Sequence, residues 1–267
     1  NIKGRLGDVV CLYLVVKMYF IVVYKQTCLV PLWFFIQPIL STLKMYIIFA
    51  KLGGISTDKI PAPLFYMTGL TIWNYFAESL TKTSETFIKN QNIFGKVFFP
   101  RLIVPLSVII SNLLKFGIQF TLLLVVWGYY LLIYKNEFVN RNIMLLLVPV
   151  LVIMMAGLSL GFGILFSSIT TKYKDMNFLL LFGVQLLMYA SSVVIPISTI
   201  SLAAPNYEWV FRLNPMVNII EAFKYAFLGE GGFDWMWLGY SAGFMIALLF
   251  FGVIIFNRVE KSFMDTV

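Results

Sequence analysis

Long apolar stretches alternate with short polar connections along this chain. Six such stretches, each interrupted by few charges, cover residues 28–50, 61–80, 102–134, 143–170, 176–200 and 235–257. A helix needs about 20 apolar residues to cross the hydrocarbon core of a bilayer, whereas the strands of a membrane barrel are shorter and alternate polar with apolar side chains. The pattern therefore predicts an all-α membrane protein with six transmembrane helices.

The composition agrees with lipid as the main solvent of this chain. Hydrophobic residues make up 60% of it and charged residues 12%, and the mean hydropathy is +0.89. A water-soluble domain needs far more charge to cover its surface. We expect a single transmembrane domain over residues 1–267, with an N-terminal segment at 1–27, a six-span bundle at 28–257 and a short tail at 258–267.

The N-terminal segment contains an apolar run at 9–24 that only Lys17 interrupts. This run is short for a span, so we predict a helix that lies in the cytoplasmic interface, with a seventh span as the alternative. Twelve lysines and arginines fall in connections on the side of the termini, and six fall on the other side. Because positive charges concentrate in cytoplasmic loops, both termini are expected in the cytoplasm.

The connection at 81–101 is polar and predicted to be cytoplasmic, but it holds a short apolar patch around Phe94. It is either a solvated loop or a short helix that presents Phe94 to a cytoplasmic partner. The second interpretation explains why a connection in water keeps such side chains.

The connection at 201–234 is long and is predicted to lie on the outer side. Asn214 and Pro215 are typical of a helix start, with asparagine as the cap and proline at the first helical position, and Gly229 is well placed to end that helix. A second short helix is predicted at 206–213. Two short apolar helices suggest a re-entrant hairpin that dips into the outer leaflet, and a helix flat on the membrane surface is the alternative.

Several classes of chemistry are missing from the sequence. There is no histidine, and the two cysteines have no metal-like spacing. The glycine-rich segments at 157–163 and 229–232 are not followed by the Lys-Ser/Thr pair of a phosphate-binding loop. Glu78 is the one carboxylate predicted inside a span. We therefore expect no catalytic, cofactor or metal site in this chain, and any active transport would draw its energy from another subunit.

The basic excess is also informative, because the formal net charge of +8 is not clustered on a soluble face. It indicates orientation and contact with membrane lipids, and it excludes nucleic acid as an expected partner. Lys44 and Lys115 fall within spans. Both are interpreted as snorkelling or structural residues, and Lys115 could instead sit at a cavity wall that attracts an anionic lipid or phosphate.

Other side chains within the spans allow two interpretations each. Tyr66, Trp73 and Tyr75 belong either to an aromatic belt at the membrane interface or to the lining of a passage. The small-xxx-small segments at 157–161 and 239–243 are interpreted as close helix packing, within the subunit or across a dimer.

Several short motifs follow one another along the chain. They are YKQT at 24–27, PLWF at 31–34, QP at 37–38, KVFFPR at 96–101, KYKD at 172–175, LNPM at 213–216, EAF at 221–223 and EKSFMD at 260–265. In this order and spacing, which covers essentially the whole chain, the sequence resembles the permease subunits of polysaccharide-exporting ABC transporters, a family that includes exporters of O antigen, capsule and teichoic acid.

The resemblance implies a non-enzymatic permease that works as a homodimer with two copies of a separate cytoplasmic ATPase, which would hold ATP and Mg. It implies an interface helix at 8–24 and a helix around 89–97 that contacts the ATPase. The implied coupling residues are Asn92, Phe94 and Lys96.

It also implies outer gate helices around 206–228, with Asn214, Pro215 and Glu221 as candidate gate residues. Tyr66, Trp73, Tyr75 and Lys115 are candidates for the channel lining. The implied cargo is a lipid-linked polysaccharide such as O antigen, moved across the bacterial inner membrane. A drug or lipid exporter is the alternative, and a membrane-bound transferase is weakened by the missing histidines and paired acids.

Overall fold

The fold comes from a computed structural model, which describes residues 16, 29–57, 60–86, 102–133, 143–173 and 175–264 of the 267. All regular elements within these residues are helical. In chain order they are α2 (Leu29–Met45), η1 (Tyr46–Leu52), α3 (Ala62–Ser84), α6 (Ile103–Ile133), η2 (Ile143–Leu147), α7 (Val148–Lys172), α8 (Met176–Tyr189), α9 (Ile197–Ala203), η3 (Pro205–Tyr207), α10 (Glu208–Arg212), α11 (Pro215–Leu228) and α12 (Trp235–Met264).

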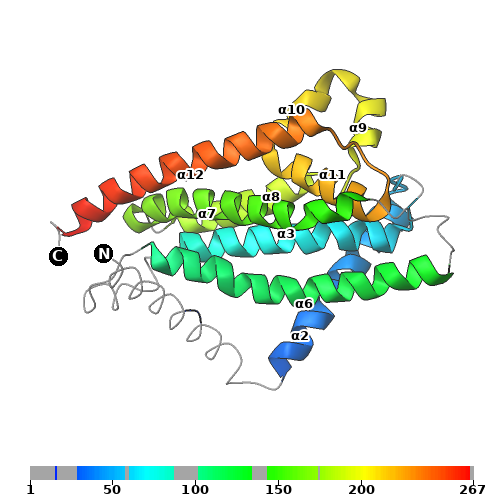
Figure 1. Cartoon of the computed structure of the whole chain (residues 1–267), viewed down its shortest axis with the longest axis horizontal. Coiled ribbons are helices and arrows are strands. Elements are labelled where there is room, and N and C mark those ends of the chain that lie inside the picture. The colour runs from blue at the N-terminus through cyan, green and yellow to red at the C-terminus, as the bar shows by residue number, and fades with distance from the viewer. Residues whose placement is uncertain are drawn as a thin grey trace.

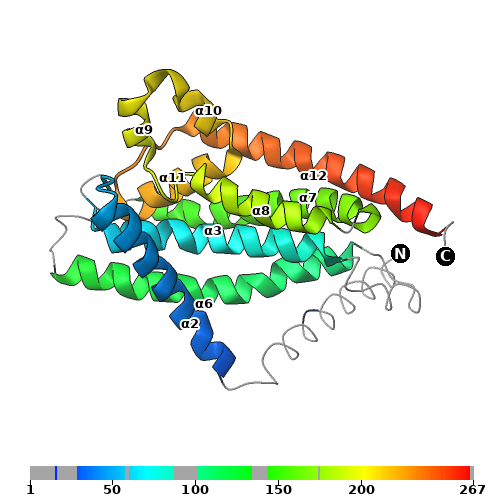
Figure 2. The same cartoon turned by 180° about the vertical axis from the view of Figure 1, so that it is seen from behind.

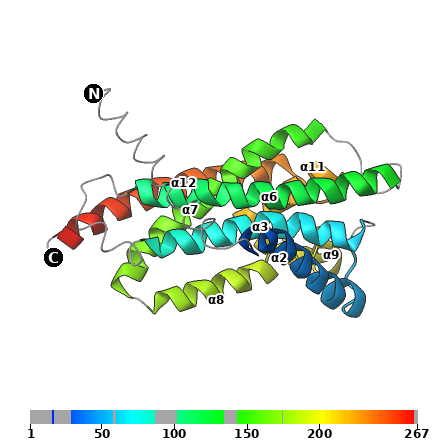
Figure 3. The same ribbon diagram turned by 90° about the horizontal axis from the view of Figure 1, so that it is seen from below.

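The long helices run along one axis, with α3 at the centre of the bundle (Figure 1). Helix α3 contacts α6, α7, α2, α8 and α11, and α7 also packs along α12. Seen from below, α3 lies between α6 and α8 (Figure 3). Helix α2 crosses the bundle at an angle, on the side of the molecule where α8 also lies (Figure 2).

Four helices are long and apolar enough to cross a membrane, at Trp33–Leu52, Ile103–Ile133, Ile143–Thr170 and Trp235–Arg258. They match four of the six predicted spans. Large apolar side chains remain exposed on the helices, such as Phe178 and Phe182 of α8 and Phe250 of α12. A water-soluble protein would not leave so much apolar surface uncovered. The prediction of an all-α membrane protein is confirmed.

The predicted span at 61–80 forms a helix, α3, which continues to Ser84. It carries more polar side chains than the four spans above because most of them face other helices. Thr68 and Thr71, for example, are buried and donate to the carbonyl oxygens of Leu64 and Met67. A central helix surrounded by protein can keep such residues, since lipid does not contact them.

The predicted single helix at 176–200 needs correction. Helix α8 ends at Tyr189 after 14 residues, a turn follows, and α9 begins at Ile197. Pro196 explains part of the interruption, because a proline disfavours helical backbone at the residue before it. A helix of this length rises about 21 Å, which is shorter than the hydrocarbon core. The count of six spans stays a prediction.

Glycines set the closest helix contacts. A Cβ atom at Gly157 would lie 2.4 Å from Met245 Sδ, and one at Gly161 would lie 2.9 Å from Leu248 Cγ. Both contacts join α7 to α12, which confirms the interpretation of this segment as packing within the subunit. Cβ atoms at Gly239 and Gly243 would meet nothing within 4 Å. For that second segment, packing across a dimer stays a prediction.

Candidate functional site

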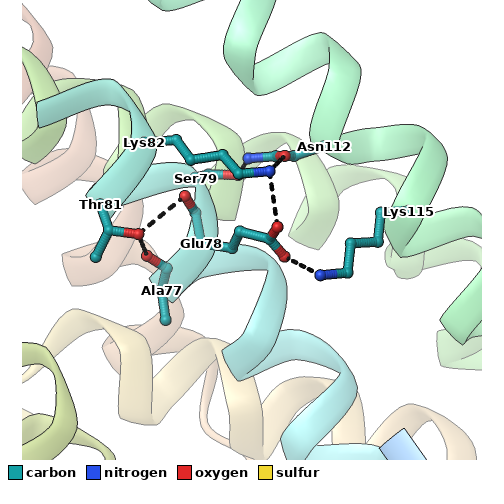
Figure 4. A network of polar contacts seen from close by, with 7 residues as sticks. All are labelled: Ala77, Glu78, Ser79, Thr81, Lys82, Asn112 and Lys115. Carbon is teal, nitrogen blue, oxygen red and sulfur yellow. Dashed lines mark hydrogen bonds and ion pairs between the residues drawn. The ribbon is translucent and has the colours of Figure 1, made fainter. Parts of the chain in front are cut away.

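The first polar site joins α3 to α6 through a shared carboxylate (Figure 4). Lys115 Nζ lies 2.6 Å from Glu78 Oε2, and Lys82 Nζ lies 2.7 Å from Glu78 Oε1. Asn112 extends this network, since its Oδ1 accepts from Lys82 Nζ at 3.1 Å and its Nδ2 donates to Ser79 Oγ at 3.1 Å. The two helices are therefore linked by charge and by an amide.

Helical spacing explains why these side chains meet. Glu78 and Lys82 are four residues apart on α3, and Asn112 and Lys115 are three apart on α6, so each pair lies on one helix face. Lys115 Nζ also lies 5.2 Å from the centre of the Phe34 ring, so Lys115 contacts α2 as well. Lys115 shares the single negative charge of Glu78 with Lys82, so the network keeps one net positive charge. A further contact of Lys115 with lipid or cargo stays a prediction.

The network's depth fits a position at the edge of the hydrocarbon. From Lys115 to Ile133, α6 rises about 27 Å, close to the ~30 Å of the hydrocarbon core. The part of α6 before Lys115 would then project beyond that core. Polar contacts continue in this direction, where Thr170 Oγ1 donates to Ser84 O at 2.8 Å and Asn177 Nδ2 donates to Glu85 Oε1 at 2.8 Å.

The predicted coupling residues Asn92, Phe94 and Lys96 lie outside the described residues, as does nearly all of the predicted interface helix at 8–24. In the sequence, Asn92, Phe94 and Lys96 belong to the connection between α3 and α6. Their role stays a prediction.

The second polar site is built on α11, at the other end of the bundle (Figure 1). Asn214 Oδ1 accepts from Met216 N at 3.1 Å, and Pro215 occupies the first turn. Gly229 ends the helix with a φ of 72°, in the left-handed region that favours glycine. The predicted start and end of this helix are confirmed, and α10 with η3 supplies the second short helix upstream.

Helix α11 is buried almost completely by other helices of the same chain. All but one of its residues are buried, and it packs against α12, α7, α3 and η2. A helix lying flat on a membrane surface keeps a broad polar face in water. The burial of α11 therefore favours a hairpin that returns into the bundle.

After α11, two charged side chains bind the backbone of Gly232, one at its amide and one at its carbonyl oxygen. Glu221 Oε2 accepts from Gly232 N at 3.0 Å, and Arg212 Nη1 donates to Gly232 O at 3.1 Å. Arg212 in turn pairs with Glu208 at 2.7 Å. Gly231 lies beside this contact with a φ of 138°, and a Cβ atom there would lie 3.1 Å from Glu221 Oε2.

Arg212 and Lys224 belong to the six lysines and arginines predicted on the outer side of the membrane, and the structure buries both. Arg212 is 9% exposed and Lys224 is 1% exposed. Lys224 donates to Ser192 O and lies over the Phe65 ring. Its place within the apolar periodicity of α11 was the available signal, since a residue at a core position of a buried helix is itself buried.

The three aromatic candidates for a channel lining are buried inside the helix bundle. Tyr66, Trp73 and Tyr75 of α3 are 0%, 3% and 3% exposed. Tyr75 packs against Phe116 of α6 with ring centres 5.3 Å apart. In a single chain they face other helices, and their part in a channel stays a prediction. Within the described residues there is no group of three or more acidic or cysteine side chains that could hold a metal ion.

Replacing Asn214 by leucine tests the start of α11. The variant loses the cap on Met216 N where little water can replace it, so we expect the free energy of unfolding to fall by about 1 to 2 kcal/mol. Thermal unfolding in detergent, with Asn206→Leu on exposed η3 as the control, measures this loss. Equal stability of the two variants would contradict the capping role.

Comparison with known proteins identifies the family. The profile of the ABC-2 type transporter family matches residues 11–228. An O-antigen export system permease protein RfbA from Klebsiella pneumoniae is 26% identical over 243 residues, which cover 91% of this chain and 89% of that protein. The protein of the same name from Myxococcus xanthus is 24% identical over 245 residues, with 91% and 90% covered.

Another relative is named for the transport of a different polysaccharide. The polysialic acid transport protein KpsM from Escherichia coli is 24% identical over 243 residues, which cover 88% of each chain. These relatives confirm the resemblance seen in the sequence motifs. Because the family profile matches most of its length, the chain belongs to the ABC-2 type transporter family.

Proposed function

We propose that this chain is the membrane-spanning permease subunit of an ATP-driven exporter that moves a lipid-linked polysaccharide, of the O-antigen kind, out of the bacterial cytoplasm. The observation that carries the proposal is the match to O-antigen export permeases of two bacteria over about nine tenths of both chains. The match to a polysialic acid transport protein supports a capsular polysaccharide as the second candidate cargo.

The energy source is assigned to partner subunits. The sequence lacks a phosphate-binding loop, so two copies of a cytoplasmic ATPase would hold ATP and Mg. Two copies of this chain would enclose the channel, because a long polymer needs a continuous passage rather than a closed cavity. The whole of 28–257 then serves as one permease domain, preceded by the interface segment at 1–27 and followed by the tail at 258–267.

The two polar sites support different roles for the two ends of the bundle. The Glu78 network lies near the end of α3, and the connection that follows α3 in the sequence is the one that we assign to ATPase contact, through Asn92, Phe94 and Lys96. The opposite end holds α11, which we assign as the outer gate with Asn214, Pro215 and Glu221. With this assignment we propose that both termini lie in the cytoplasm and that the protein resides in the inner membrane.

The proposal is tested with the permease purified together with its ATPase in lipid vesicles. Lipid-linked polysaccharide should stimulate ATP hydrolysis. Stimulation by drugs or lipids alone would favour the other class of exporter. Turnover of a sugar or acyl donor without any ATPase would contradict the proposal and favour a transferase.

Phe94 gives a separate test of ATPase contact. Truncating an aromatic anchor at an interface commonly costs about 2 kcal/mol or more, so Phe94→Ala should weaken ATPase binding at least tenfold. Copurification of the ATPase with the tagged permease measures it. Tyr207→Ala is the matched control, because Tyr207 is exposed at the other end of the bundle. Unchanged copurification and export would assign 81–101 to a solvated loop.

The orientation is tested by cysteine labelling after Cys11 and Cys28 are replaced by serine. A cysteine at Asn206 should react in intact cells with a reagent that cannot cross the inner membrane. A cysteine at Asp265 should react only after the membrane is opened. Labelling of Asp265 from outside would refute the proposed topology.

A further inference from the structure

We infer that Lys224 is a positioning residue that fastens α11 to the turn at 190–196, so that this helix and this turn act as one rigid unit. The inference rests on the proposed function in taking α11 as part of the outer gate. The contacts that carry it lie within the described residues.

The first step is the environment of Lys224. Its side chain is 1% exposed, its ammonium donates to the carbonyl oxygen of Ser192, and its Nζ lies 3.5 Å from the centre of the Phe65 ring. A buried ammonium is stable only where its donors and its charge are matched by nearby groups. A carbonyl dipole and an aromatic face contribute to that match. The two contacts link α11 to the turn and to α3.

The second step is the nature of the acceptor. Ser192 follows the end of α8, in the turn that splits the predicted fifth span. Ser192 lies three residues beyond Tyr189, so its carbonyl oxygen belongs to the turn and not to the hydrogen-bond ladder of α8. A buried backbone carbonyl needs a donor, and a lysine from α11 supplies one here. Ser191, Ser192, Val193 and Val194 of the turn are all buried, so water has little access to replace it.

The third step concerns Gly69 of α3, which lies where the turn and Lys224 meet this helix. A Cβ atom at Gly69 of α3 would lie 3.3 Å from Val193 Cα and 3.6 Å from Lys224 Cε. A Cβ atom there would crowd the backbone of the turn, while its distance to Lys224 Cε would be an ordinary van der Waals contact. Three segments far apart in the sequence, α3, the turn and α11, therefore meet at one junction.

The fourth step is that α11 is fastened along its length by other groups as well. Glu221 binds the Gly232 amide at 3.0 Å, and Trp127 Nε1 of α6 donates to Phe227 O at 2.7 Å. A tilt of α11 relative to the turn would break the hydrogen bond from Lys224 to Ser192 O, where little water could replace it. Opening of the gate is therefore expected to move α11 and the turn together.

The experiment measures passive efflux of a trapped dye from vesicles that contain the full-length permease with its ATPase, without ATP or polymer. Lys224→Met should raise the efflux rate about tenfold, since losing a hydrogen bond to a charged group changes an equilibrium constant by about that factor or more. Lys224→Arg, which keeps charge and donors, should stay closed. Gly69→Val should leak as well, because it pushes the turn away.

Matched controls separate this junction from general damage. Lys44→Met removes an exposed lysine of α2, and Gly117→Val adds a side chain to α6 where a Cβ atom would meet nothing within 4 Å. Both should stay closed. Equal efflux from Lys224→Met and the wild type would overturn the inference.

A second measurement tests whether α11 and the turn move together, and it does not require Lys224→Met to fold. Ser192 Oγ lies 3.5 Å from the backbone oxygen of Val217, so the turn and α11 are close enough here for cysteines at the two positions to be joined by a short reducible thiol crosslinker. If helix and turn move as one unit, the crosslinked protein should retain ATP-driven export. Loss of export on crosslinking, recovered on reduction, would overturn the inference. Absence of polysaccharide export from the wild type too would count against the proposed function instead, and the efflux result would still stand.

Discussion

Gly163→Leu should destabilise the protein by about 3 kcal/mol, near the upper end of the range for an overpacked core. A Cβ atom at Gly163 would lie 2.6 Å from both Cβ and Cγ2 of Thr83, closer than carbon atoms can approach. Thr83 is fully buried and branched at Cβ, so it has few rotamers with which to escape. Helices α3 and α7, which pack side by side through the centre of the bundle, would have to separate.

Thermal unfolding in detergent measures this loss. Gly183→Leu is the matched control, because a Cβ atom at Gly183 of α8 would meet nothing within 4 Å. It should unfold within a few degrees of the wild type. Equal unfolding temperatures for the two variants would show that α3 and α7 do not pack as closely as described.

Removal of the Glu78 carboxylate should have the second largest effect. Glu78→Leu leaves Lys115, whose side chain is 17% exposed, without its anionic partner. Breaking a fully buried pair in this way costs about 3 to 5 kcal/mol, and partial exposure reduces the expected loss to about 2 kcal/mol. The lysine would have to leave the bundle or bind water within it.

A double-mutant cycle isolates the pair. Replacing both partners, as Glu78→Leu with Lys115→Met, should restore much of the stability, because apolar groups of similar size often replace a buried pair at little cost. The free energy of unfolding of the double variant should thus exceed that of Glu78→Leu alone. Simple additivity of the two single changes would contradict a direct interaction.

Features with a local cause were predictable from the sequence. The start of α11 at Asn214 and Pro215 and its end at Gly229 follow from capping chemistry within a few residues. Four of the predicted spans match apolar helices because length and hydrophobicity alone decide membrane insertion. The packing of Gly157 against Met245 was also predictable in kind, though the partner helix was not.

Features that depend on tertiary structure were not predictable from the sequence. Apolar residues continue through 193–195, so the interruption after Tyr189 had only Pro196 and two serines as local signals. The pairing of Glu78 with Lys115 requires α3 and α6 to be neighbours. Nor does the sequence show that Lys224 contacts the carbonyl oxygen of Ser192, which lies 32 residues away in the chain.

The central claim is that this chain forms the passage of an ATP-driven polysaccharide exporter. The most direct measurement follows radiolabelled lipid-linked polysaccharide in inside-out vesicles that contain the permease and its ATPase. The account predicts that polymer enters the vesicle lumen only with ATP and only when both subunits are present. Absence of entry under these conditions, or equal entry without the permease, would contradict it.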